Sequence, residues 1–193
     1  MITHIQGKLT EKNPTHVVID CNGIGYMLNI SLHTYSQIPD GEFLKLYTHL
    51  QVKEDSHTLY GFSSLAEREI FRLLISVSGI GASIARTMLS SLTPKQVREG
   101  IAGGDVPLIQ SVKGIGAKTA QRVILDLKDK VLKIYDIDEV SVSKGNTNKE
   151  EALSALEVLG FAKKQAERVV DKIMVTQSDA DVETIIKQAL KNL

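Results

Sequence analysis

The first third of the chain alternates apolar and polar positions in the way that half-buried β-strands do. In residues 43–50, for example, leucine stands at positions 44, 46 and 50, with the β-branched Thr48 between them, which indicates a strand with one face in a core. Asn22-Gly23 separates two apolar runs and is a strong signal for a β-hairpin. The pattern predicts five strands, at 2–11, 16–21, 25–30, 43–53 and 57–62. A small barrel is the economical way to hide the edges of so few strands.

From Ser64 onward the apolar period becomes helical. Ile70, Phe71 and Leu74 share one helical face, and Thr93-Pro94 is typical of an N-cap followed by proline at the first helical position. The pattern predicts helices at about 65–74, 82–90, 94–102 and 117–134.

The last quarter of the chain contains a polar stretch followed by short helical segments. Residues 136–148 carry no periodic apolar face and are interpreted as a flexible linker. Three helices are predicted after it, at about 149–159, 163–174 and 179–190. Gly160 is placed to end the first of these helices, and Ser178 to cap the third.

An internal repeat is the sharpest feature of the sequence. Residues 79–92 and 114–127 lie 35 positions apart, are identical at six of fourteen positions and share the block Gly-Ile-Gly-Ala. A helix is predicted before and after each block. Two glycines at i and i+2 permit positive φ and let backbone N–H groups approach a ligand closely, while the following helix adds its own N–H groups and dipole. The blocks therefore predict a pair of anion sites that suit phosphodiesters.

Charge is distributed unevenly along this chain of net charge 0. Residues 63–135 contain 11 Lys and Arg against 6 Asp and Glu, whereas residues 1–62 contain 4 against 6 and residues 136–193 contain 8 against 11. The repeat thus lies in the basic segment, which favours a polyanionic partner over the plainer interpretation of two tight turns between packed helices. Lys118 and Arg122 lie four residues apart on one helical face beside the second block.

Other features exclude several classes of protein and site. The single cysteine, Cys21, cannot form an internal disulfide, and no Cys/His cluster indicates a metal. No cofactor motif, signal peptide or membrane span is visible, so we expect a cytoplasmic protein. No helix carries the side chains that read base edges, which predicts sequence-independent binding with a steep salt dependence.

The repeated blocks resemble helix-hairpin-helix motifs, and the whole chain resembles the RuvA family, the Holliday-junction-binding subunits of bacterial branch-migration complexes. Further residues carry the resemblance outside the repeat: Ile2, Gln6-Gly7, Gly23-Ile24-Gly25-Tyr26, Val52-Lys53-Glu54-Asp55 and Leu59-Tyr60-Gly61-Phe62. The resemblance implies an α+β multidomain fold. Its expected parts are an OB-fold β-barrel (1–63), a tandem helix-hairpin-helix domain (64–135), a flexible linker (136–148) and a three-helix bundle (149–193).

The resemblance also implies a function and a set of partners. The expected role is structure-specific binding of four-way (Holliday) junctions, which are held open and planar, and recruitment of the hexameric RuvB ATPase through residues 149–193. Four subunits would form a flat plate, and the resemblance leaves open whether the assembly is this tetramer or an octamer in which two plates sandwich the junction. The RuvC resolvase is a further expected partner. No catalytic residue, metal or cofactor is implied.

Site residues are carried over from the family position by position. The expected DNA-binding residues are Gly79, Gly81, Ser83, Arg86, Gly114, Gly116, Lys118, Thr119 and Arg122. Ser83 stands where the family often has a lysine, so the first hairpin has less charge to offer. Glu54 and Asp55 would form an acidic pin that repels phosphates at the crossover, although Glu-Asp at a hairpin tip is ordinarily a solvated turn.

The turn Leu159-Gly160-Phe161 resembles the first loop of a ubiquitin-associated-type bundle, which exposes an apolar patch to a partner. Apolar residues of this region belong either to such a patch or to the core of the bundle itself. The candidates are Val158, Leu159, Ala162, Val169 and Ile173.

Two other functions are considered. Glycosylase/lyases carry a similar hairpin with a nucleophilic lysine, here Lys118, and an aspartate eighteen residues later, here Asp136. Against this, Asp136 opens a polar linker and the first third is strand-rich. An OB-fold binder of single strands would stack bases on aromatic side chains, but the chain has only four Phe, five Tyr and no Trp.

Overall fold

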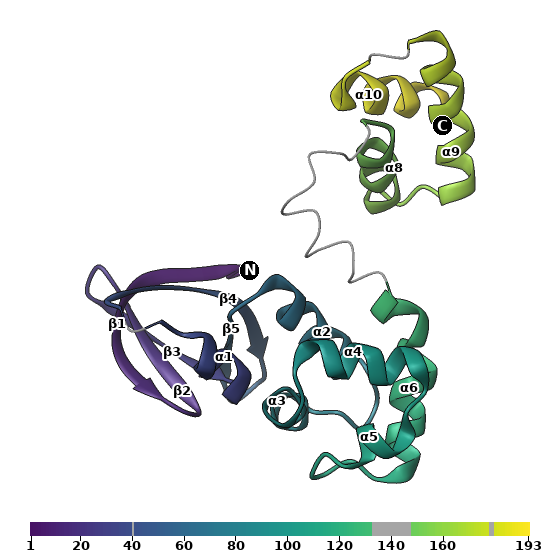
Figure 1. The fold of residues 1–193 in the computed structure, drawn as a ribbon. Helices are drawn as coiled ribbons and strands as arrows, with labels where there is room; N and C mark the ends of the chain where they lie inside the picture. The colour runs from purple at the N-terminus through teal and green to yellow at the C-terminus, as the bar shows by residue number, and fades with distance from the viewer. Residues whose placement is uncertain (40, 133–147, 178–179) are drawn as a thin grey trace. The chain divides into compact units, whose positions relative to one another are not determined.

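The computed structural model describes residues 1–39, 41–132, 148–177 and 180–193 (Figure 1). Contacts divide the chain into two units, Met1–Asp138 and Glu139–Leu193, and each is described by itself. Most of the expected linker, residues 136–147, lies outside the described residues.

The first unit begins with a closed five-stranded barrel of strand order β1-β2-β3-β5-β4, which confirms the expected OB-type barrel. The β3–β5 pair is parallel and the other pairs are antiparallel. Asn22 (φ 55°) and Gly23 (φ 91°) turn the β2–β3 hairpin with the two positive φ values of a type I′ turn. The strands are β1 (His4–Asn13), β2 (His16–Cys21), β3 (Ile24–Ile30), β4 (Phe43–Val52) and β5 (His57–Phe62).

A short helix that the apolar pattern did not predict, α1 (Leu32–Gln37), connects β3 to β4. Its N-cap Ser31 accepts a hydrogen bond from the backbone N–H of Thr34. Ile38, directly after the helix, is buried in the barrel core. Six residues are too few to show a helical period, so α1 could not be recognised from periodicity.

Helices follow the barrel within the same unit, and an aromatic cluster joins the two parts. Phe71 of α2 is fully buried; its ring centroid lies 4.9 Å from that of Phe62, 5.0 Å from that of Tyr60 and 5.5 Å from that of His49. Aromatic pairs at these separations favour tilted packing. The helices are α2 (Leu65–Ile75), α3 (Ala82–Ser91), α4 (Pro94–Gly103), α5 (Val106–Gln110) and α6 (Ala117–Leu132). The helix α5 fills the place expected for a helix before the second Gly-Ile-Gly block.

A buried carboxylate also connects the barrel to the helices. Glu67 of α2 is fully buried and accepts hydrogen bonds from Ser31 Oγ (2.5 Å), Thr34 Oγ1 (2.6 Å) and the backbone N–H of Ser63 (3.2 Å). These donors belong to α1, to its N-cap and to the residue that directly follows β5. Because a buried charge is tolerated only when it is hydrogen-bonded, this arrangement fixes α2 against the barrel.

The second unit is a three-helix module of α8 (Asn148–Val158), α9 (Lys163–Thr176) and α10 (Val182–Asn192). Gly160 (φ 96°) ends α8, as its position predicted. The prediction that Ser178 caps the third helix is wrong: Asp181 is the N-cap, and its carboxylate accepts from the backbone N–H of Thr184. Ser178 itself lies outside the described residues.

Side chains of the module separate into core and surface. Ile173 is buried and Val169 packs against the core, whereas Val158 and Leu159 are exposed and so is Ala162. Two of the five apolar candidates of the sequence therefore belong to the core of the module, and three lie on its surface. Within the described ranges, no helix is both long enough and apolar enough to traverse a membrane.

Candidate nucleic-acid interface

The two Gly-Ile-Gly loops share several hydrogen bonds at corresponding positions. Ser76 Oγ donates to Leu73 O at 2.7 Å, and Ser111 Oγ donates to Leu108 O at 2.7 Å. The backbone N–H of the central isoleucine donates three residues back in both loops, at 3.0 Å for Ile80 and 3.1 Å for Ile115. The sequence repeat is thus also a structural repeat, and it begins at least three residues before the first glycine.

The isoleucine and the first glycine of each block have structural roles. Ile80 and Ile115 are buried, so they anchor the loops in the helical core. Gly79 and Gly114 have φ values of 96° and 94°, a conformation that side chains other than glycine rarely adopt.

The second glycine of each block is not required by the fold. Gly81 has φ −85° and ψ 166°, which any residue adopts, and Gly116 is absent from the residues with positive φ. Within the part of the chain that the structure describes, a Cβ added at either position would meet no atom within 4 Å beyond its chain neighbours. These two glycines therefore keep a solvent-facing space clear rather than relieve a backbone constraint.

Each second glycine lies at the start of a helix whose end is open to solvent. Gly81 is the N-cap of α3 and makes no side-chain cap hydrogen bond, and its carbonyl accepts from Ala85 N at 3.0 Å. The corresponding bond from Ala120 N to Gly116 O is 2.9 Å. The first N–H groups of such a helix have no intrahelical acceptor, and together with the helix dipole they attract anions. We call these two loop-helix junctions, residues 78–87 and 113–122, cup 1 and cup 2.

The cups contact one another reciprocally. A Cβ at Gly79 would lie 3.8 Å from Thr119 Cγ2, and a Cβ at Gly114 would lie 3.8 Å from Ile84 Cγ1. Ile84 and Thr119 are again 35 residues apart, so each loop faces the same position of the other repeat. Such an i-to-j and j-to-i relation is the signature of an approximate two-fold axis.

Most of the expected DNA-binding side chains lie at the cups, but the side chain of Arg86 is directed toward the barrel. Ser83, Lys118 and Arg122 are exposed and Thr119 is half-buried. Arg86 instead points to the barrel, where its Nη1 donates to Asn29 Oδ1 at 2.9 Å and Thr15 O at 3.3 Å. Its guanidinium therefore ties α3 to the barrel, a structural task that its place in the repeat did not reveal.

Sequence reasoning missed one cation of cup 2. Lys113 is exposed immediately before Gly114, and its counterpart in the first repeat is Ser78. Extending the repeat upstream to the shared Ser-Val pairs at 76–77 and 111–112 would have found it.

Glu54 and Asp55 occupy the tip between β4 and β5, and both are exposed. The tip is a tight hairpin turn, closed by a hydrogen bond from Lys53 N to Ser56 O at 2.8 Å. Ser56 Oγ donates to Asp55 Oδ1 at 3.2 Å. Both carboxylates therefore lie at the tip of a hydrogen-bonded two-stranded arm.

The geometry gives little support to the two alternative functions. Lys118 is exposed, so it lacks the desolvation that is one route to activating a Schiff-base lysine. Asp136 lies outside the described residues. Of the barrel's aromatic side chains in the described residues, Phe43 alone is exposed, so there is no row of rings on which bases could stack. Among the described residues, no three His, Cys, Asp or Glu side chains form a metal-binding group.

Comparison with known proteins covers nearly the entire chain. Family models match as the RuvA N-terminal domain at residues 1–61, a SAM-like helix-hairpin-helix tandem at 71–129 and the RuvA C-terminal domain at 147–193. Similar relatives bear the name Holliday junction branch migration complex subunit RuvA. One from Flavobacterium psychrophilum is 70% identical, and one from Christiangramia forsetii 69%, each over 193 residues and the full length of both chains. A relative from Bacteroides thetaiotaomicron is 46% identical, again over the full length of both.

Proposed function

Because the chain belongs to the RuvA family of Holliday junction branch migration subunits, we propose that its paired cups bind the sugar–phosphate backbones of a four-way junction. The chain binds the junction by structure rather than sequence, and works with the RuvB motor in branch migration. It acts as a DNA-binding subunit and performs no catalytic step of its own.

One observation carries the placement of DNA at the cups. Gly81 and Gly116 are glycines that the fold does not need, and they leave open space at two related helix starts. An approaching phosphate needs that space, because a side chain there would stand between its oxygens and the helix N–H groups. Backbone contacts of this kind position a protein on DNA without reading its sequence.

Exposed cations strengthen the binding at cup 2. Lys118 and Arg122 lie one helical turn apart, and within the described part of the chain no carboxylate forms an ion pair with either of them. They are available for charge-assisted hydrogen bonds to phosphate oxygens. Each contact releases condensed counterions, so binding weakens steeply with salt.

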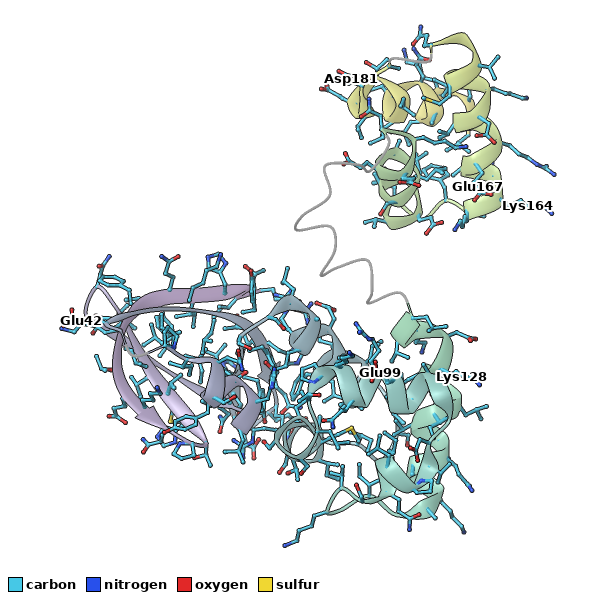
Figure 2. All side chains as sticks on the ribbon, viewed as in Figure 1. Glu42, Glu99, Lys128, Lys164, Glu167 and Asp181 are labelled. Atoms are coloured by element: carbon cyan, nitrogen blue, oxygen red, sulfur yellow. The ribbon has the colours of Figure 1, made fainter. Side chains whose placement is uncertain are left out.

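The test is equilibrium binding of a labelled four-way junction, the matching duplex and a single strand across a range of salt concentrations. The junction should bind most tightly, and Lys118→Ala with Arg122→Ala should flatten the salt slope by about 0.9 for each phosphate that is no longer neutralised. Lys128→Ala with Lys130→Ala removes the same charge farther along α6, where Lys128 is exposed (Figure 2), and should change the slope less. Equal affinity for junction and duplex would contradict the proposed function.

The remaining parts of the chain complete the proposal. Four copies form a plate in which the Glu54 and Asp55 tips meet at the crossover, where negative charge keeps the strands apart. A second plate closes over the junction in the octamer. The three-helix module contacts RuvB, and the RuvC resolvase acts on the same complex. The protein works in the bacterial cytoplasm.

A further inference from the structure

The two cups have similar backbone structures, but the side chains around cup 1 are uncharged where those around cup 2 are positively charged. Their loops share hydrogen bonds, backbone angles and a buried isoleucine. Three positions at 35-residue spacing nevertheless differ in charge. Cup 1 and its helix have Ser78, Ser83 and Thr87 where cup 2 and its helix have Lys113, Lys118 and Arg122.

The one basic residue of α3 does not restore the missing charge at cup 1. This residue, Arg86, is held by Asn29 and Thr15 of the barrel. The Thr87 hydroxyl donates to Ser83 O at 3.0 Å, so it is engaged within its own helix. Cup 1 therefore offers backbone N–H groups and the Ser78 and Ser83 hydroxyls, whereas cup 2 offers N–H groups with three cations.

The approximate two-fold axis determines what this difference does to DNA. A duplex has two-fold axes that exchange its strands, and a two-fold protein element binds it by placing one half on each strand. The reciprocal contacts Gly79–Thr119 and Gly114–Ile84 give the cups that symmetry. On a duplex arm, cup 1 would thus meet one strand and cup 2 the other.

From these observations, and resting on the proposed function, we propose that the chain binds the two strands of each junction arm with unequal electrostatic strength. We call this difference the unequal grip. Cup 2 holds one strand through charged, salt-sensitive contacts, and cup 1 holds the other through uncharged contacts. During branch migration the strand under cup 1 slides with less electrostatic resistance. Because all arms are equivalent on a four-fold plate, the favoured strand has the same polarity in every arm.

The experiment replaces phosphates with uncharged methylphosphonates on one strand class at a time. Each oligonucleotide of a four-way junction has a half that runs 5′ to 3′ toward the crossover and a half that runs away from it. Two junctions are made, with methylphosphonates in all incoming halves or in all outgoing halves. For the unmodified protein, one of these junctions should bind about tenfold more weakly than the other, because only one strand class depends on charge-assisted hydrogen bonds.

A double variant that exchanges the residues at positions 83 and 118 tests whether the cations of cup 2 cause the strand difference. Ser83→Lys with Lys118→Ser moves one cation from cup 2 to cup 1 at exposed positions and leaves the net charge unchanged, so the fold should persist and the thermal midpoint verifies it. The exchange should shrink the strand difference or reverse it. Ser83→Lys alone should tighten junction binding and steepen the salt slope by about one.

Several outcomes would overturn the inference. Equal affinities for the two methylphosphonate junctions, with preference for the junction over duplex intact, would reject the unequal grip and leave the proposed function standing. An exchange variant that keeps the original strand difference would also reject it. Loss of junction preference in the unmodified protein would reject the proposed function, and the inference with it.

Discussion

Gly79 and Gly114 differ from Gly81 and Gly116 in what the backbone demands of them. The first pair adopts φ values of 96° and 94°, so Gly79→Ala with Gly114→Ala should lower the free energy of unfolding by about 1–2 kcal/mol per site. Denaturant unfolding measures this decrease. Gly103→Ala is the control, because Gly103 is exposed near the end of α4 with no atom within 4 Å of an added Cβ. A double variant as stable as the unmodified protein would contradict the structural role of these two glycines.

A second residue-scale prediction concerns His49, at the contact between the barrel and α2. Its partial burial lowers the pKa of its imidazole, and the Arg72 and Arg68 guanidinium groups lower it further. The unfolded chain therefore binds a proton more readily than the folded chain as the pH falls below about 6.5. Folding stability that is present at neutral pH should decline as the solution is acidified through this range.

The measurement is the thermal midpoint between pH 7.5 and 5. His49→Gln removes the titrating group and should flatten the curve in this range, after allowance for the ring packing against Phe71 that the substitution also removes. His57, which is exposed on β5, provides the control substitution His57→Gln. Identical pH curves for the unmodified protein and His49→Gln would show that this imidazole does not couple folding to pH.

Among the elements, those with a clear local signal were predicted and those set by tertiary contacts were not. The strands follow from alternation, and α4 from its Thr93-Pro94 cap, which the structure shows as a capping box with Gln96. The helix α1 has no period to detect. Glu67 occupies an ordinary position of an amphipathic helix, and its complete burial depends on hydroxyl donors more than thirty residues earlier in the chain.

The candidate site was predictable to the same extent. The repeat alone places both cups and their glycines, because positive φ and helix starts leave direct marks in sequence. The contact of Arg86 with the barrel could not be predicted, because it requires Thr15 and Asn29 to lie beside α3. The structural dispensability of the second glycines likewise depends on the open space around them, which the sequence does not reveal.

The acidic tip of the β4–β5 hairpin makes an element-scale prediction. Glu54→Lys with Asp55→Lys reverses two exposed charges on a turn whose closing hydrogen bonds are made by the backbone, so the barrel should remain folded. Duplex affinity should stay the same or rise, and the preference for a junction over a duplex should decrease. Competition binding of the two DNAs measures the preference. An unaltered preference would contradict the role of the tip at the crossover.

At the scale of the whole molecule, the two units have separate cores. Among the described residues, the buried cluster of the last three helices lies within residues 152–189, and the buried clusters of the first unit lie within residues 5–131. Deleting residues 149–193 should therefore leave junction affinity intact and abolish stimulation of the RuvB ATPase. In the full chain, Val158→Asp with Leu159→Asp changes only exposed side chains and should reduce stimulation in the same way. Weakened junction binding by the truncated chain would contradict this division of labour.

We propose that the cups hold phosphates in the space that Gly81 and Gly116 keep clear. The most direct test is the junction affinity of the double variant Gly81→Ser with Gly116→Ser, measured together with its thermal midpoint. Serine is a better N-cap than glycine and suits the backbone of Gly81, so the fold should be as stable as before or slightly more stable. The new hydroxyl groups would accept hydrogen bonds from the helix N–H groups and fill the space that a phosphate needs. The affinity for the four-way junction should therefore fall by about tenfold or more. Unchanged affinity with an unchanged or raised midpoint would contradict the claim.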